Sequence, residues 1–242
     1  MTGAFVPEPA RRAWFLLAAC ILAACQAGQS TAALAADPRH PEVVELFQSQ
    51  GCSSCPPANR NVMPLAGRPD VLVLSWQVTY WDYLGWKDSF ADPAFTARQH
   101  AYARSLGHDG VWTPQVVING RGDVVGSDRS QLGRALYDFD RGAGGPSLVL
   151  SGEAVRVDGI GKNAVLTMIR YDPRILQVPI RAGENGGATL PHRNVVREVM
   201  LLGVWNGGSH AFHLPGARQT GLKIAVLLQQ GPAGPILAAV HD

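Results

Sequence analysis

Two cysteines three positions apart follow directly on an apolar run, and this arrangement constrains the fold more than any other feature of the chain. The run is Val43-Val44-Glu45-Leu46-Phe47, and the motif is Gly-Cys-Ser-Ser-Cys-Pro-Pro over residues 51–57. The run predicts a buried strand. The two prolines suit the first turn of a helix, because the N–H groups that they lack have no helical partner there. The sequence therefore predicts a strand, the cysteine pair and a helix, with Cys52 where the helix dipole favours a thiolate.

The spacing of the pair is typical of a thiol–disulfide exchange site. Exchange needs a thiolate, and a helix N-terminus lowers the pKa of a cysteine below its free value of about 8.5. We predict that Cys52 attacks a substrate disulfide and that Cys55 resolves the mixed disulfide, with no cofactor beyond the redox-active disulfide Cys52–Cys55. The alternatives are a permanent disulfide without turnover and, more weakly, a metal site, since two cysteines supply only half of the usual four zinc ligands.

The first 36 residues have the pattern of an export signal. Arg11-Arg12 precedes an apolar stretch over residues 13–24, and Ala33-Leu34-Ala35 offers a cleavage site. The stretch is too short to cross a bilayer comfortably. A lipoprotein signal, with a lipid anchor at Cys25, is the competing interpretation. Both predict a periplasmic or secreted protein, or a membrane-anchored lipoprotein without a membrane span.

Export also bears on the cysteines. Cleavage after Ala35 removes Cys20 and Cys25 and leaves only the motif pair, which an oxidising compartment can hold as a disulfide. We therefore expect the partners to be protein thiols or disulfides of the cell envelope. The net charge is +2, without a basic stripe or an acidic tail, so nucleic acid is not an expected partner.

Strand and helix patterns alternate between residues 37 and 141. Strands are predicted over residues 43–48, 71–78, 115–118 and 124–126, and helices over about 56–66, 93–106 and 129–139. The order is strand, helix, strand, helix, strand, strand, helix. It is that of a thioredoxin-like domain, an α/β fold whose central mixed sheet is flanked by helices.

Thr113-Pro114 precedes the third of these strands. In thioredoxin-like folds a cis-proline loop faces the cysteine pair, and the residue before the proline offers its backbone to an extended substrate. Only about 5–6% of X-Pro bonds in folded proteins are cis, so the position of the dipeptide, rather than the dipeptide itself, predicts a cis bond here. We assign Thr113 and Pro114 to substrate binding.

The second half of the chain has a different pattern. Residues 142–146 are rich in glycine and predict a linker. From residue 147 to residue 242, strand-like runs are separated by turns such as Asp158-Gly159 and Asn206-Gly207-Gly208. This predicts a β-rich C-terminal domain or extension packed on the first domain.

The aromatic segment over residues 80–86 follows the second strand. Trp81 and Tyr83 would wall a substrate groove beside the cysteines, although packing of the loop onto the domain explains large aromatics equally well. Asp82 and Glu45 are the candidate proton acceptors for the buried thiol. His108-Asp109, before the proline loop, is a weaker candidate to approach the thiols.

Two further patterns have simple explanations. Arg121-Gly122-Asp123 spells an adhesion tripeptide, but turn chemistry of the predicted hairpin accounts for it. His210 and His213 have ligand-like spacing but no third ligand in view.

Taken together, these residues resemble an exported bacterial family catalogued as domain of unknown function 1223, over about residues 42–242. The resemblance rests on the cysteine block over residues 44–58, the aromatic block over 80–88, and shorter matches at 113–115, 126–129, 183–187 and 194–197. It implies a thioredoxin-like fold and a redox-type site, and it supplies no substrate. Gln77 and Thr79 stand where the family pattern leads us to expect His and Asp, so those side chains are not there to assist proton transfer.

The sequence thus predicts an exported thiol–disulfide oxidoreductase. Two alternatives stay open. One is a non-catalytic binding module of thioredoxin fold with a structural disulfide, and the other is a copper-handling protein that uses Cys52, Cys55 and a histidine.

Overall fold

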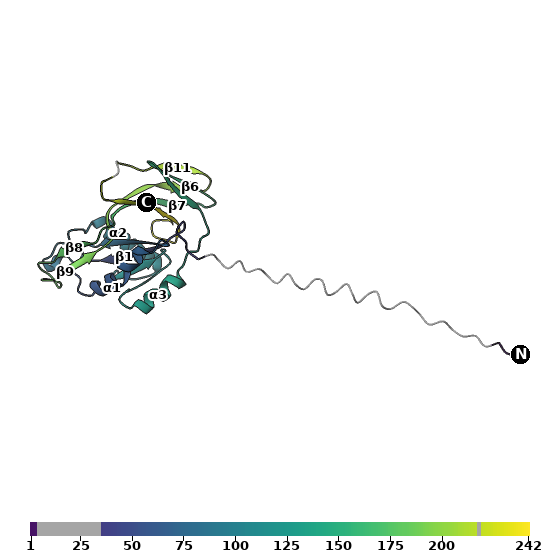
Figure 1. The fold of residues 1–242 in the computed structure, drawn as a ribbon, viewed down its shortest axis with the longest axis horizontal. Helices are drawn as coiled ribbons and strands as arrows, with labels where there is room; N and C mark the ends of the chain where they lie inside the picture. Colours follow the sequence, from purple (N-terminus) through teal and green to yellow (C-terminus); the bar gives the residue numbers. More distant parts are fainter. Residues whose placement is uncertain (4–34, 217–218) are drawn as a thin grey trace. The chain divides into compact units, whose positions relative to one another are not determined.

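The computed structural model describes residues 1–3, 35–216 and 219–242 (Figure 1). The expected signal, with Arg11-Arg12, Cys20 and Cys25, lies outside the described residues except at its ends. The described residues from Ala35 to Asp242 belong to one compact unit. Among the described residues, no helix is long and apolar enough to cross a membrane.

A mixed sheet of eight strands forms the centre of this unit, in the order β13-β12-β7-β10-β2-β1-β3-β4. β1 runs parallel to β2 and antiparallel to β3. β10 lies parallel to β2 through the pairing of Val195 with Ser75, and antiparallel to β7. The strands are β1 Glu42–Gln48, β2 Val71–Gln77, β3 Gln115–Ile118, β4 Gly122–Val124, β7 Ala164–Asp172, β10 Val195–Trp205, β12 Lys223–Gln230 and β13 Ile236–His241.

Helix α2, Pro93–Leu106, covers one face of the sheet. The side chain of Asp92 accepts a hydrogen bond from the N–H of Ala94, and Gly107 ends the helix in a left-handed conformation. Aromatic side chains of β1, β2 and α2 pack together beneath the helix, with neighbouring ring centroids 5.2–6.0 Å apart: Phe47, Trp76, Phe95 and Tyr102. The same core continues under β7, β12 and β13, so this face is continuous across the sheet.

Two different layers cover the opposite face. Helices α1, Cys55–Val62, and α3, Arg129–Asp138, pack on the half formed by β1 to β4. The half formed by β7, β12 and β13 packs against a small sheet of order β11-β6-β5. Its strands are β5 Ser147–Ser151, β6 Ala154–Asp158 and β11 His210–His213. Figure 1 draws β6 and β11 at the top of the view and α1 and α3 at the bottom.

The remaining elements are short. A two-stranded sheet consists of β8, Leu176–Pro179, and β9, Thr189–His192. The 3-10 helices are η1, Met63–Gly67, and η2, Asp82–Leu84. η1 contains Pro64 and follows α1 directly, because a proline inside a helix removes a backbone hydrogen bond and ends the α-helical pattern.

The predicted α/β, thioredoxin-like fold class is wrong. Instead of a helix-flanked sheet with a β-rich addition, the structure has one eight-stranded sheet whose strands come from both sides of residues 142–146. Only three α-helices occur among the described residues, and a second sheet takes the place of helices over half of one face. The physical reason is the pairing of β10 with β2. Such a pairing joins segments 120 residues apart and leaves no mark on the local hydrophobic pattern.

Candidate active site

The loop after β1 carries the cysteine pair to the start of α1. The N–H of Cys52 donates to the carbonyl of Ser49, and the N–H of Cys55 donates to the carbonyl of Cys52, both at 3.2 Å. The two cysteines form a disulfide with their Cα atoms 5.4 Å apart. Both are buried, with exposed fractions of 0% for Cys52 and 1% for Cys55. The predicted order of strand, cysteine pair and helix is therefore confirmed, but the sulfur atoms are closed to solvent.

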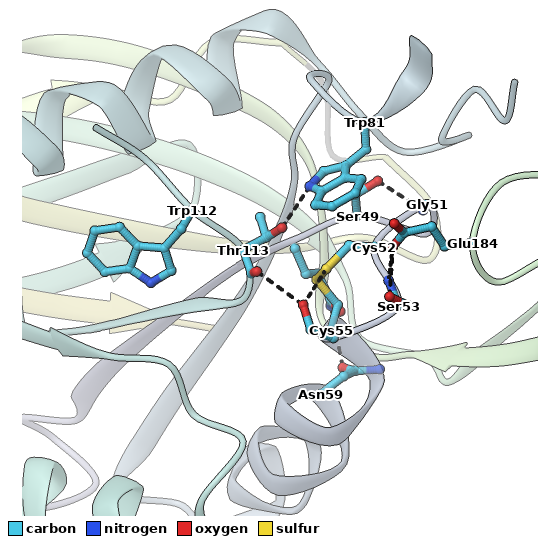
Figure 2. Close-up of a disulfide and its surroundings, with 12 residues drawn as sticks. Ser49, Gly51, Cys52, Ser53, Cys55, Asn59, Trp81, Trp112, Thr113 and Glu184 are labelled. Atoms are coloured by element: carbon cyan, nitrogen blue, oxygen red, sulfur yellow. Dashed lines mark hydrogen bonds between the residues drawn. A yellow bond between two sulfur atoms is a disulfide. The ribbon is translucent and has the colours of Figure 1, made fainter. Parts of the chain in front are cut away.

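The Thr113–Pro114 loop lies on one side of the disulfide, and its peptide bond is cis, as predicted. The hydroxyl of Ser54 connects the loop to the cysteines, because it lies 3.3 Å from both the carbonyl oxygen of Thr113 and the sulfur of Cys52 (Figure 2). The single proton of this hydroxyl can be donated to either neighbour. Ser54 thus joins the sulfur atom to the main chain of the proline loop.

The aromatic segment closes the site from above in Figure 2. The indole N–H of Trp81 donates to the hydroxyl of Thr113 at 2.7 Å. A Cβ atom at Gly51 would lie 3.3 Å from the Cβ of Trp81, so the two segments are in close contact. Trp86 donates to the side chain of Gln50 at 2.9 Å. Tyr83, by contrast, is 80% exposed. Trp81 therefore packs the segment onto the site, while Tyr83 projects into solvent.

The other side of the cysteine loop is held by residues 183–185, which we call the cap. They lie in the turn between β8 and β9. The carboxylate of Glu184 accepts from the N–H of Ser53 at 3.0 Å and from its hydroxyl at 2.7 Å. The side-chain amide of Asn185 donates to the carbonyl oxygens of Gln50 and Cys52, both at 2.9 Å. Figure 2 shows Ser53 and Glu184 across the disulfide from Thr113.

The cap was not among the candidate site residues found from the sequence. Its only signal there is the block over residues 183–187, which carries part of the family resemblance and predicts a glycine-rich turn. Gly183 and Gly187 do adopt left-handed backbone conformations, with φ of +74° and +88°. The turn chemistry is thus visible in the sequence, but its contact with the cysteine loop is not.

A small pocket reaches Cys55 from the side of α1 and β9. Its volume is about 150 Å³, and it is lined by Gln48, Ser49, Cys55, Pro56, Asn59, Arg60 and residues 189–192. Asn59 fixes one wall, since its amide donates to the carbonyl of Pro191 at 2.6 Å. His192 is buried beside this pocket, and desolvation lowers its pKa to about 4, so the imidazole is neutral.

The two candidate proton acceptors do not meet the thiols. Glu45 lies on the α2 face of the sheet, where Arg98 holds its carboxylate with hydrogen bonds of 2.6 and 2.8 Å. Tyr102 donates to the same carboxylate. Asp82 accepts from the N–H of Asp88 at 3.1 Å. Glu45 therefore forms a buried ion pair with Arg98.

Asp88 is a buried carboxyl group that bonds directly to the main chain just before the cysteines. It accepts from the N–H of Gln50 at 2.7 Å and from the N–H of Phe90 at 2.9 Å. Burial raises its pKa to about 6 against the opposing effect of these hydrogen bonds. The pKa of Glu184, in contrast, is lowered by the hydrogen bonds from the Ser53 hydroxyl and N–H. The two carboxyl groups that hold the loop thus titrate in different pH ranges.

The remaining candidates have structural partners. His108 and Gln115 both bond the carboxylate of Asp123, at 3.1 and 2.6 Å, so this residue of the Arg-Gly-Asp tripeptide faces inward. Gln77 donates to Ser75 at 3.0 Å, and the hydroxyl of Thr79 lies 3.0 Å from that of Thr96. Within the described parts of the chain, no cluster of three or more His, Cys, Asp or Glu side chains could hold a metal ion.

Comparison with known proteins adds a family and a fold. A family model described as a protein of unknown function, DUF1223, matches residues 43–229. The crystal structure of a protein from Agrobacterium tumefaciens is 34% identical with a TM-score of 0.67, over 83% of this chain and 92% of that chain. HBP35 of Porphyromonas gingivalis is 14% identical with a TM-score of 0.56, over 84% of this chain and 75% of that chain, a likeness of fold alone. No curated protein matches the chain.

Proposed function

The chain belongs to the DUF1223 family, whose description names no activity, and we propose from the geometry of its own site that it exchanges disulfides with other proteins. The observation that carries this proposal is the Cys52–Cys55 disulfide at the start of α1, with the main chain of Thr113 beside it. A disulfide that only cross-links a loop does not need main-chain groups beside it to bind another chain. A disulfide that exchanges with a polypeptide does need them, since the main chain of Thr113 can orient the incoming chain.

The reduced site would favour a thiolate at Cys52. Its sulfur lies next to the first turn of α1, where the helix dipole stabilises negative charge. The Ser54 hydroxyl, 3.3 Å from the sulfur, would donate its proton to the thiolate in place of the Thr113 carbonyl. Both effects lower the pKa of Cys52 and make it the attacking thiol.

The exchange balances as two successive displacements. The Cys52 thiolate attacks one sulfur of a substrate disulfide, forms a mixed disulfide and releases the other substrate sulfur as a thiolate, which takes a proton from water. The Cys55 thiol loses its proton and attacks the Cys52 sulfur, which releases the second substrate thiolate. Two electrons pass from the cysteine pair to the substrate, and the reverse sequence oxidises a substrate dithiol.

Substrate binding is assigned to the edge that surrounds the sulfur atoms. Thr113 and Pro114 would align an extended segment, Trp81 would hold the loop in place, and the exposed ring of Tyr83 would contact the substrate. The export pattern of residues 1–36 supports an extension of the proposal, in which this chemistry takes place in the periplasm or outside the cell, or at a membrane through a lipid on Cys25. The partners are then protein thiols and disulfides of the cell envelope.

Trapping of mixed disulfides tests the proposal. Reduced Cys55→Ser and reduced Cys52→Ser proteins are each mixed with an oxidised envelope extract, and adducts are separated by non-reducing electrophoresis. We expect adducts with Cys55→Ser, because the attacking thiol stays and the resolving thiol is gone. The matched Cys52→Ser variant should form none. Equal adducts from both variants, or none from either, would overturn the assignment.

A non-catalytic binding module with a structural disulfide is the second candidate, and the burial of both cysteines favours it. In that case the disulfide fixes the loop, and the aromatic segment contacts a partner. The reduction potential separates the two functions. A value below about −300 mV, resistant to glutathione, belongs to a structural disulfide, and a higher value belongs to an exchanging one. A copper site has no support in the described residues, which contain no suitable ligand cluster.

A further inference from the structure

We propose that the surface under the cap is the docking site of the substrate, and that the Glu184–Asn185 turn is a displaceable occupant of it. The proposal rests on the proposed exchange function and adds to it the chemistry of the segment that binds. That segment is an extended peptide with a carboxylate beside its reactive sulfur. It replaces Glu184 at Ser53 and places N–H donors where Asn185 now lies.

The contacts of the cap define this chemistry. All four of its hydrogen bonds to the cysteine loop involve the main chain or the short side chain of Ser53. A carboxylate satisfies the N–H and hydroxyl of Ser53, and an amide satisfies the carbonyls of Gln50 and Cys52. A peptide supplies the same groups from an acidic side chain and from its own N–H groups, as when an extended segment pairs with an exposed edge.

Because the disulfide is buried, at least one of the segments around it must move before a protein substrate can react. Cys52 is 0% exposed, so no protein disulfide reaches its sulfur while the surrounding segments stay in place. Glu184 itself is exposed, and so is Ser53. Because Glu184 and Ser53 are both well solvated when they separate, the net contribution of their hydrogen bonds is smaller than that of the same bonds in a buried site. The contact that holds the cap on the cysteine loop is therefore one that water or a competing peptide can replace.

The cap also belongs to an element that can move. β8 and β9 form a sheet of their own, without pairing to the eight-stranded sheet. A two-stranded hairpin is marginally stable by itself. Gly183 and Gly187 supply left-handed conformations at both sides of the turn, and such positions absorb changes of backbone angle at low cost. The cap can therefore swing away while β9 stays attached through Pro191 and Asn59.

The first experiment measures access to the disulfide without requiring any exchange activity. The oxidised protein is reduced by a water-soluble phosphine, and the rate is compared for wild type, Glu184→Ala and the control Glu153→Ala. Glu153 is an exposed glutamate in the turn between β5 and β6 and carries the same charge. We expect reduction to become faster by about threefold or more in Glu184→Ala and to stay unchanged in the control.

A second pair of variants opens the cap without removing its carboxylate. Gly183→Ala places a side chain at φ of +74°, where an L residue is strained. Gly152→Ala is the matched control, since Gly152 has φ of +59° in another turn and nothing lies within 4 Å of its added Cβ. Faster reduction in Gly183→Ala alone supports the cap. If Glu184→Ala and Gly183→Ala are both reduced at the wild-type rate, the assignment of residues 183–185 as a displaceable cap is overturned.

The third experiment tests the docked segment. Reduced Cys55→Ser is mixed with two peptides that carry an activated disulfide and differ only by Glu or Gln next to the cysteine. We expect the Glu peptide to react faster than the Gln peptide. Adding Ser53→Ala to the Cys55→Ser protein should reduce the ratio of the two rates. Equal rates overturn the docking assignment. If neither peptide reacts while Glu184→Ala still accelerates phosphine reduction, the exchange function fails and the docking assignment fails with it, but the cap stands.

Discussion

The indole N–H of Trp81 donates a 2.7 Å hydrogen bond to the hydroxyl of Thr113, and this bond ties the aromatic segment to the cis-proline loop. The two residues are 32 positions apart and approach the disulfide from different segments. The same hydroxyl-bearing residue offers its carbonyl to Ser54, which contacts Cys52. Trp81 thus acts on the sulfur through two intermediate residues, and we regard it as a positioning residue.

Replacing Trp81 with Phe tests this relationship. A smaller aromatic ring stays and the N–H donor is lost, so the free energy of unfolding should fall by about 1 kcal/mol for the lost hydrogen bond, in addition to the cost of the space that the indole leaves. The rate of mixed-disulfide formation should fall more than the stability alone explains, because the proline loop is no longer held. Trp112→Phe is the control, since the Trp112 N–H is buried without a hydrogen-bond partner. Equal exchange rates in the two variants would contradict a positioning role.

Reduction of the disulfide should lower stability modestly. The bond closes a ring of four residues, and the loss of chain entropy in the unfolded state predicts about 2 kcal/mol for a loop of that size. Urea unfolding of the oxidised and reduced protein measures the difference. A Cys52→Ala/Cys55→Ala double variant should unfold like the reduced protein, with or without reductant. A loss of the whole fold on reduction would instead mark the disulfide as the structural element of the second candidate function.

Asp88 and His192 should make opposite contributions to stability between pH 4 and pH 7. The pKa of Asp88 is raised to about 6, so the folded state keeps a proton that the unfolded state has lost, and this contribution falls as pH rises through that range. The pKa of His192 is lowered to about 4, so the unfolded state binds a proton that the folded state does not, and this contribution rises with pH. The two effects largely cancel in the wild-type protein.

Single variants separate the two effects. Relative to wild type, the unfolding free energy of Asp88→Asn should rise by about 3 kcal/mol from pH 4 to pH 7. That of His192→Gln should fall by about 3 kcal/mol over the same range. Urea unfolding at the two pH values checks both. Differences from wild type that do not change with pH would show that neither group is as buried in solution as it is here.

Local signals predicted the parts of the site that come from one stretch of chain. The apolar run before the cysteines and the prolines after them act within a few residues, and the strand and the helix that they predict lie where expected. The cis bond at Thr113–Pro114 was also predictable, although from its place in a family of folds that the whole chain does not follow. Short-range chemistry was sufficient for these features.

Pairings between distant segments account for what the sequence did not predict. β10 joins β2 through Val195 and Ser75, so strands from the two predicted parts of the chain share one sheet. Glu184 meets Ser53 across 131 positions, and Glu45 meets Arg98 across 53. A charged residue in an apolar strand looks the same in the sequence whether it ends in an ion pair or beside a thiol. Only the fold of the whole chain decides between the two.

The protonation of Glu184 should control access to the disulfide at acidic pH. The hydrogen bonds from the Ser53 hydroxyl and N–H lower its pKa below the usual 4.5, so the cap is stabilised above that value and released as pH falls through the lowered one. A phosphine reduces disulfides without a thiolate, so its rate can be followed down to pH 3. The ratio of the Glu184→Ala rate to the wild-type rate should exceed one at pH 6 and fall toward one as the pH drops through the lowered pKa of Glu184. Glu153→Ala should give a ratio of one throughout, and a ratio for Glu184→Ala that is constant across this range would contradict control of the cap by this carboxylate.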